Sequence, residues 1–107
     1  MPTETINITA RCPIRTTLEL LGGKWKLLIL FQLNHRAMRL SQLKAAIPDI
    51  SEKMLIQELK TLADNQLITR TNFGEVPPRV EYTLTQKGSL AIPLIGEMKK
   101  FADSYAA

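Results

Sequence analysis

The chain of 107 residues contains one cysteine, one histidine and no long apolar run. A single cysteine cannot build an internal disulfide framework, and the sequence shows no zinc-ligand spacing. The longest run of large apolar residues covers positions 27–31, whereas a membrane-spanning helix needs about 20 residues. A disulfide-rich secreted domain, a zinc module and a membrane protein are therefore excluded as classes.

The N-terminal stretch MPTETINITARCP lacks both the basic start and the apolar core of a secretory signal. We therefore expect a cytoplasmic protein in a reducing environment. Residues 1–10 are polar and β-branched without periodicity, which is typical of a flexible arm. Because no linker or repeat follows, we expect one domain over residues 11–107.

The charge balance of the chain is modestly basic. The net charge is +4 and the isoelectric point is about 9.5, with 22% charged and 45% hydrophobic residues. This is the composition of an ordinary globular protein. The positive excess favours an anionic partner such as nucleic acid, but it is too small to identify one without a structural motif.

Residues 40–88 are the most informative part of the chain, because they show the order of two short helices, a turn and a two-stranded ribbon. Ser41 is expected to cap the first helix. Three apolar side chains of this helix are expected to point inward: Leu43, Ala46 and Ile47. The order of elements predicts a helix-turn-helix, which presents its second helix to the major groove of DNA.

The second helix of this motif is expected to begin after Ser51 and to end at Asn65 in a left-handed residue. Placing residues about 100° apart puts four apolar side chains on one side: Leu55, Leu59, Leu62 and Ala63. The opposite side carries Lys53, Gln57, Lys60 and Asp64. The pattern predicts a helix that packs through one stripe and exposes a polar stripe.

A β-wing is expected after this helix. Residues 68–73 are rich in threonine and favour a strand, and residues 79–84 alternate between apolar and polar side chains as a strand does. Pro77 and Pro78 cannot donate to a central ladder, so they are expected at the wing tip or at an edge.

Helices are also expected on both sides of this motif. Pro13 predicts a helix with Cys12 as its N-cap, and residues 24–33 are apolar nearly all round, which predicts a core helix buried on most sides. Thr85 is expected to cap one long last helix that Pro93 kinks. The apolar stripe of this helix is longer than a small monomer readily covers, which predicts a dimer.

Several of these stretches together resemble a known family. They are CP at 12–13, GGKW at 22–25, residues 40–67, EVPPRVEY at 75–82 and LTQKG at 84–88. In this order they resemble the HxlR family of bacterial and archaeal regulators, a winged-helix group related to MarR, over roughly residues 11–105. Ile56 and the pair Phe73-Gly74 depart from the residues that are commoner in that family.

The resemblance implies a mainly α fold with a small antiparallel β-wing, a winged helix-turn-helix that dimerises through its N- and C-terminal helices. It implies a homodimeric transcriptional regulator, for example a repressor, that binds a pseudo-palindromic operator in double-stranded DNA without a cofactor. The dimer interface is then expected to contain Ile14, Leu18, Ala91, Leu94, Met98, Phe101 and Tyr105.

The DNA-contacting side chains are expected on the helix-turn-helix and the wing. They are Ser41, Ser51, Glu52, Lys53, Gln57, Lys60, Arg70 and Arg79. Glutamine can pair with adenine, lysine can reach guanine or phosphate, and a wing arginine can reach the backbone or the minor groove. The alternative is a plain solvated face. For Arg79 the equally weighted alternative is an ion pair with Glu75 or Glu81 that only fixes the wing.

Cys12 is a candidate redox sensor. A thiol at a helix N-cap beside Arg11 and Arg15 lies in a positive field that favours the thiolate. The resemblance adds that some members of the family sense oxidants or electrophiles through a cysteine near this place. The alternative is a small packing residue without a redox role. A disulfide needs either a second copy of Cys12 in a partner chain or a low-molecular-weight thiol.

Other functions stay open on the sequence alone. Trp25, with Phe101 and Tyr105, is a candidate lining for a small-molecule effector pocket, although aromatic residues on core helices usually serve packing. A winged-helix module that binds proteins without DNA is the main rival to a DNA-binding regulator. A cysteine enzyme is remote, because Cys12 and His35 are the only conceivable nucleophile–base pair and nothing orients a third group.

Overall fold

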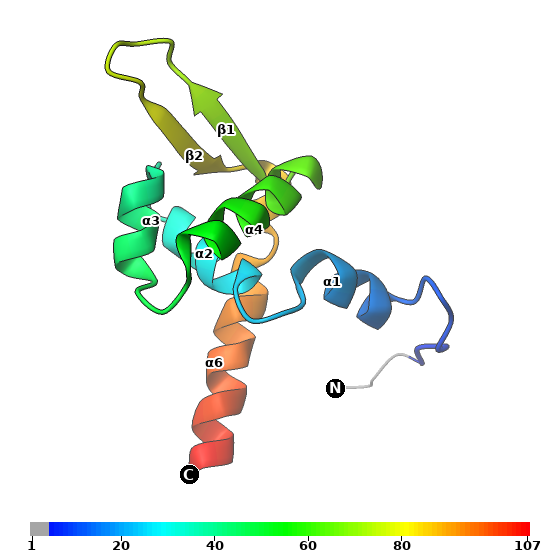
Figure 1. Cartoon of the computed structure of the whole chain (residues 1–107). Helices are drawn as coiled ribbons and strands as arrows, with labels where there is room; N and C mark the ends of the chain where they lie inside the picture. The colour runs from blue at the N-terminus through cyan, green and yellow to red at the C-terminus, as the bar shows by residue number, and fades with distance from the viewer. Residues whose placement is uncertain (1–4) are drawn as a thin grey trace.

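The computed structural model describes residues 5–107. The elements in chain order are α1 (Pro13–Leu21), α2 (Lys26–Leu33), α3 (Leu40–Ala46), α4 (Glu52–Asp64), β1 (Ile68–Asn72), β2 (Val80–Leu84), α5 (Gln86–Ser89) and α6 (Ile92–Ala106). The hairpin of β1 and β2 projects from one end of the molecule, α6 projects from the other, and α1 lies to one side (Figure 1). Over the described residues, no helix is long and apolar enough to span a membrane.

The helices α2, α3 and α4 enclose an apolar core together with the start of the hairpin. Its buried residues are Ile29, Leu30, Leu33, Met38, Leu43, Ile47, Ile50, Leu55, Leu59, Leu62, Leu67, Ile68 and Ala91. Burying a large aliphatic side chain contributes about 1.5–3 kcal/mol, so this cluster provides the main driving force for the fold. The mainly helical architecture with one antiparallel wing is the predicted one.

Two predictions of burial are wrong. The helix α2 is not buried on most sides, because Leu28 is 46% exposed and Phe31 is 42% exposed. An apolar face of α2 therefore meets solvent in the single chain. In α3, Ala46 is exposed and does not point inward, because Leu43 and Ile47, one turn apart, already fill the side of the helix that faces the core.

The two helices of the helix-turn-helix both begin at a cap. Ser51 Oγ accepts a hydrogen bond from a backbone N–H at 3.1 Å, so α4 begins where predicted. The predicted cap of α3 is wrong: its N-cap is Arg39, whose backbone N–H donates to Gln42 Oε1 at 2.8 Å. The glutamine side chain satisfies a donor at the helix start, so the helix begins earlier and Ser41 lies within its first turn.

Backbone hydrogen bonds, rather than Asn65, end α4. The left-handed residue is Gln66 with φ 63°, whereas Asn65 has φ −88°, so that prediction is wrong by one position. Gln66 N donates to Ala63 O at 3.0 Å, and Leu67 N donates to Leu62 O at 2.9 Å. This pair of bonds satisfies the last carbonyls of the helix and turns Leu67 into the core.

The hairpin is tied to the helices by a bridge that the sequence did not indicate. Its strands pair with Ile68 opposite Leu84, and the two prolines lie in the loop between them, as predicted. Met38 N donates to Tyr82 O at 3.0 Å, and Tyr82 N donates to Met38 O at 2.8 Å. These two bonds fasten β2 to the segment between α2 and α3.

The predicted long last helix is divided in two. Thr85 Oγ1 accepts a hydrogen bond from Gly88 N at 3.0 Å and so caps the short α5, and α6 starts anew at Ile92. Pro93 therefore lies in the first turn of α6, where a missing N–H breaks no helical bond, and the predicted kink is wrong. A side chain at Gly88 would collide with Leu67 O, so glycine permits the close approach of α5.

The N-terminal part of the chain leads into α1. Pro13 is its first residue and Cys12 is its N-cap, as predicted. Residues 5–10 are exposed and form neither helix nor strand. The rest of the arm predicted over residues 1–10 lies outside the described residues.

Candidate nucleic-acid interface

The helix α4 turns its polar stripe to solvent. Lys53, Gln57 and Lys60 are exposed, while Leu55 and Leu59 on the other side are buried. The helix also packs against β1, so the stripe and the wing belong to one packed unit (Figure 1). This is the arrangement in which a winged helix-turn-helix can place a helix in the major groove and a hairpin on the flanking backbone.

The start of α4 offers hydrogen-bond donors to an anion. Ser51 Oγ is occupied as an acceptor by the cap bond, which leaves its O–H free to donate. The free N–H groups of the first turn carry partial positive charge, which Glu52 in the same turn partly offsets. Lys53 is exposed and forms no ion pair within residues 5–107. Ser41 is exposed in the first turn of α3.

A groove of about 360 Å³ separates α4 from the hairpin. It is lined by Ile56, Leu59, Lys60, Ala63, Asp64, Arg70 and Tyr82. Lys60 Nζ lies 3.1 Å from Asp64 Oδ2, but both side chains are largely exposed. Such surface pairs contribute little, so a phosphate can compete for Lys60. The groove therefore carries two cationic side chains, one from the helix and one from β1.

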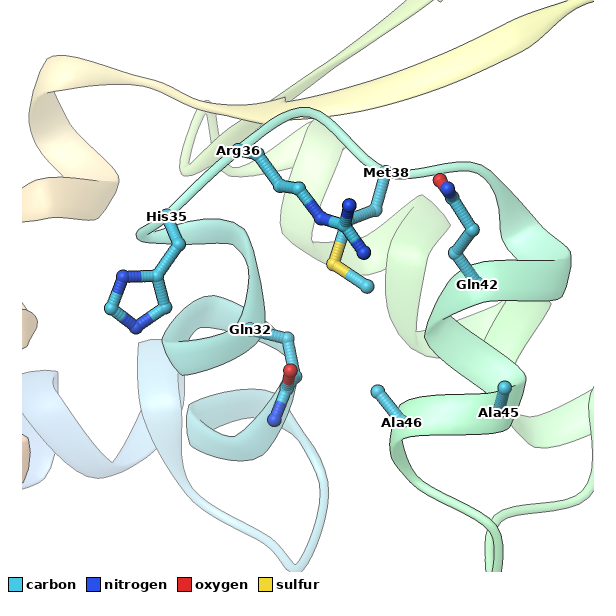
Figure 2. Close-up of a pocket in the computed structure, with 7 residues that line it drawn as sticks. All are labelled: Gln32, His35, Arg36, Met38, Gln42, Ala45 and Ala46. Atoms are coloured by element: carbon cyan, nitrogen blue, oxygen red, sulfur yellow. The ribbon is translucent and has the colours of Figure 1, made fainter.

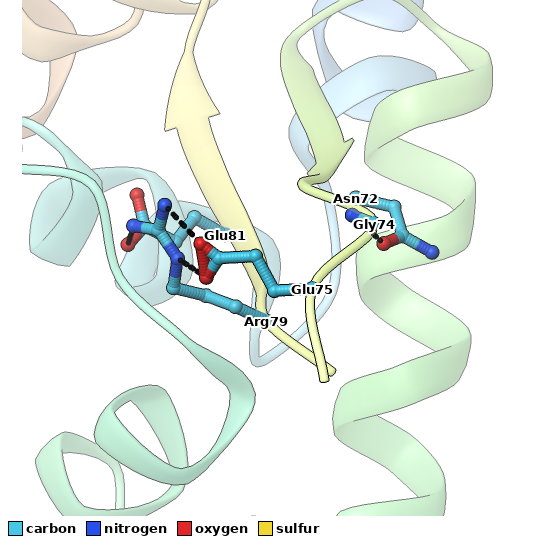
Figure 3. A network of polar contacts seen from close by, with 5 residues as sticks. All are labelled: Asn72, Gly74, Glu75, Arg79 and Glu81. Atoms are coloured by element: carbon cyan, nitrogen blue, oxygen red, sulfur yellow. Dashed lines mark hydrogen bonds and ion pairs between the residues drawn. The ribbon is translucent and has the colours of Figure 1, made fainter. Parts of the chain in front are cut away.

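In the wing, Arg79 is bound by two carboxylates (Figure 3). Its Nε lies 2.9 Å from Glu75 Oε1, and its Nη1 lies 3.2 Å from Glu81 Oε2. The hydrogen bond with Glu75 raises the pKa of Arg79. The guanidinium also lies over the Phe73 ring, 3.8 Å from its centroid. These contacts favour the alternative in which Arg79 fixes the wing. At the tip, Val76 is 97% exposed.

A mostly buried ion pair joins α2 to α4. Lys26 Nζ lies 2.7 Å from Glu58 Oε1, and the two side chains are only 15% and 12% exposed. Sequence reasoning missed this pair because its members lie 32 positions apart. The only signal was a lysine at the start of a mostly apolar helix. The pair therefore links α4 to α2 through a residue of α4 that does not line the groove.

Cys12 is a buried cap. The residue is 3% exposed, and its Sγ accepts a hydrogen bond from Arg15 N at 3.5 Å. The neighbouring arginines are exposed. No other cysteine exists in the chain. Within residues 5–107, no group of three or more His, Cys, Asp or Glu side chains is placed to hold a metal ion.

A second groove, of about 420 Å³, lies between α2 and α3 (Figure 2). His35 and Arg36, from the segment that follows α2, line it together with Gln42 of α3. The His35 ring packs edge-on against Phe31, with 5.8 Å between ring centroids. The histidine thus has an aromatic partner and lies in a groove to which Cys12 does not contribute.

The structure separates the other predicted site residues. Trp25 packs against the core with the Lys24 ammonium 4.6 Å from its ring centroid. Phe101 stacks with Tyr105 near the end of α6, at 6.3 Å between centroids. Ala91, predicted in the dimer interface, is 5% exposed and belongs to the core of its own chain, because it follows α5 where the chain turns inward.

Comparisons of sequence point to one family. The HxlR-like helix-turn-helix family matches residues 20–107. The uncharacterised HTH-type transcriptional regulator YkvN of Bacillus subtilis is 41% identical over 95 residues, which are 89% of this chain and 80% of that protein. An uncharacterised HTH-type transcriptional regulator of Methanothermobacter thermautotrophicus is 38% identical, over 90% of this chain and 73% of its own.

The solved structures that are similar to this chain are also those of transcriptional regulators. A transcriptional regulator assigned to the MarR family from Porphyromonas gingivalis W83 is 50% identical, with a TM-score of 0.85 over 90% of this chain and 94% of its own. The redox regulator HypR in its oxidised form is 32% identical, with a TM-score of 0.81 over 87% and 96%. The reduced form of YodB from B. subtilis is 37% identical, with a TM-score of 0.77 over 88% and 93%.

Replacing Glu58 by glutamine should destabilise the protein, because the Lys26 ammonium then lacks its counter-charge in a mostly buried place. We expect a loss of about 2–4 kcal/mol in the free energy of unfolding, slightly below the range for fully buried pairs. Urea unfolding at one fixed protein concentration measures it. The matched control is Glu97→Gln, whose pair with Lys100 is exposed and should cost less than about 1 kcal/mol. Equal losses in the two variants would contradict the positioning role.

Proposed function

Because the chain belongs to the HxlR-like helix-turn-helix family of transcriptional regulators, we propose that it binds a pseudo-palindromic operator as a homodimer, on DNA in the cytoplasm. The observation that carries this proposal is the exposed polar stripe of α4 beside a two-stranded wing. The fold and the relatives are those of transcriptional regulators, which are not enzymes.

In the proposed complex, α4 lies in the major groove. Gln57 can form a bidentate pair with adenine, and Lys53 can reach guanine or a phosphate. Ser51 and the first N–H groups of α4 suit a phosphate at the helix start. Lys60 and Arg70 face the groove between the helix and the wing, where the backbone of one strand can run. In this proposal Arg79 stabilises the wing through its ion pairs with Glu75 and Glu81 and does not contact DNA.

Selection of bound duplexes from a random pool tests this function. Wild type should select a two-fold motif whose half-sites lie about one helical turn, or a multiple, apart. Gln57→Ala should relax one base pair in each half-site and cost about 1–3 kcal/mol on the best sequence. Lys60→Ala should weaken all duplexes alike and lower the log–log salt slope by about 0.9 for each phosphate that the lysine no longer neutralises.

Lys99→Ala is the matched control, since it removes the same charge from α6 at an equally exposed position. It should leave both the motif and the salt slope unchanged. A wild-type protein that selects no motif would refute the proposal and leave a winged-helix module that binds proteins. If Gln57→Ala selects the wild-type motif, the glutamine is not a reader.

The proposed dimer covers apolar surface that the single chain leaves open. Neither α1 nor α6 has a buried residue. The exposed large apolar side chains on these helices include Ile14, Leu18, Leu94, Met98, Phe101 and Tyr105. Leu28 and Phe31 are further exposed apolar side chains on α2, and α2 packs against α6. If a second copy covers these side chains, the apolar residues of α2 that are exposed in the single chain become buried in the dimer.

Met98→Glu should produce a monomer or an unfolded chain, because it buries a carboxylate in the proposed interface. Light scattering at micromolar concentration measures the mass. Gly96→Glu adds the same charge on the opposite face of α6, where nothing lies within 4 Å of an added Cβ, and it should remain a dimer. A wild-type monomer at this concentration would refute the dimer.

We further propose that the regulator responds to oxidants through Cys12. HypR is a redox regulator, and YodB has been solved after diamide treatment. Oxidation would join two thiols and pass two hydrogens to the oxidant. The second thiol is the partner subunit's Cys12 or a low-molecular-weight thiol. Because Cys12 is only 3% exposed, this reaction requires the chain around the thiol to open.

Diamide should lower the operator affinity of wild type and leave that of Cys12→Ser unchanged. Serine is a good N-cap, so the variant keeps the start of α1. A coupling of about 1–3 kcal/mol corresponds to a change of about 5–150-fold. Equal responses of both proteins would make Cys12 a packing residue only.

A further inference from the structure

Ile56 lies at an unusual place on α4. Its side chain is 49% exposed, although it is a large aliphatic residue on the helix with the polar stripe. It lines the groove between α4 and the hairpin, together with Lys60 from its own helix and Arg70 from β1. Ile56 is therefore an apolar side chain on the side of α4 that faces the wing, in the same groove as the cationic side chains of Lys60 and Arg70.

The exposure of Ile56 does not by itself indicate a function, because single exposed aliphatic residues are common on protein surfaces. The location of Ile56 is what distinguishes it. In the proposed complex α4 lies in the major groove, and this side of the helix faces the strand whose backbone runs between the helix and the wing. The Ile56 side chain can then contact a base edge or a sugar of that strand. An aliphatic group gains nothing from a polar base edge and leaves the donors and acceptors it covers unpaired.

Among the features by which the major groove distinguishes base pairs, the C5-methyl of thymine is the one apolar group, and the others are hydrogen-bond donors and acceptors. We propose that Ile56 is a specificity-determining residue that contacts a thymine C5-methyl in each half-site. This inference rests on the proposed DNA-binding function. It adds an apolar base contact to the polar contacts proposed for the exposed stripe of α4. It also predicts a thymine next to the base pair that Gln57 contacts.

Removing the methyl and the side chain independently tests the proposal. The selected operator is synthesised with each thymine in turn replaced by deoxyuridine, which lacks only the C5-methyl. For wild type, one replacement per half-site should weaken binding about four-fold, the factor that corresponds to about 0.8 kcal/mol for one buried carbon group. For Ile56→Ala, the same replacement should have no effect. Ile56→Val should give an intermediate response.

Met54→Ala is the matched control. Met54 is 37% exposed on the same helix but lies two positions away, near the opposite edge, so it should keep the wild-type response to deoxyuridine. Alanine is a good helix former and both side chains are partly exposed, so both variants should remain folded, which a thermal unfolding curve checks.

Three outcomes are distinct. Loss of the methyl response in Ile56→Ala but not in Met54→Ala supports the contact. A methyl response that is the same in wild type and Ile56→Ala, or no methyl response at all, overturns the role of Ile56 while specific DNA binding stands. A wild-type protein that selects no sequence overturns the proposed function and this inference together.

Discussion

The burial of one stripe of α4 is the constraint on which the rest of this structure depends. Leu55, Leu59 and Leu62 are each at most 1% exposed, and they pack in the same core as α2 and α3. Their burial fixes the rotation of α4 about its axis, because a helix has one face for the core and an opposite face for solvent. Every proposed DNA contact on α4 depends on that rotation. The Lys26–Glu58 pair adds a second restraint.

The wing is held by contacts of a different kind. Hydrogen bonds between Met38 and Tyr82 attach β2 to the helices, and Arg79 binds carboxylates on both sides of the wing loop. A short two-stranded hairpin is marginally stable by itself, so these attachments are what give the wing a defined position. Because the Arg79 guanidinium already binds two carboxylates, it is less available to DNA. The proposed contacts with the DNA backbone therefore come from Lys60 and Arg70.

The chain divides into a part that completes its own core and a part that does not. The helix-turn-helix and the start of the hairpin bury most of their large apolar side chains within one chain, whereas α1 and α6 contribute no buried residue of their own. In the proposed dimer, a second copy supplies the missing cover, and the distance between the two α4 helices is then set by α1 and α6. Cys12 lies at the start of α1, so a chemical change there would act on the spacing of the reading helices rather than on their base contacts.

The sequence by itself determined the elements that depend on neighbouring residues. The cap at Ser51, the stripe of α4, the Cys12 cap before Pro13 and the proline loop of the wing are all local, and they were predicted correctly. The tertiary structure decided what depends on distant partners. It paired Lys26 with Glu58, 32 positions apart, and joined Met38 to Tyr82 by backbone hydrogen bonds. It also decided the ends of helices, where several residues can satisfy the same free N–H and carbonyl groups, so that the choice follows from which side chains the core has to bury.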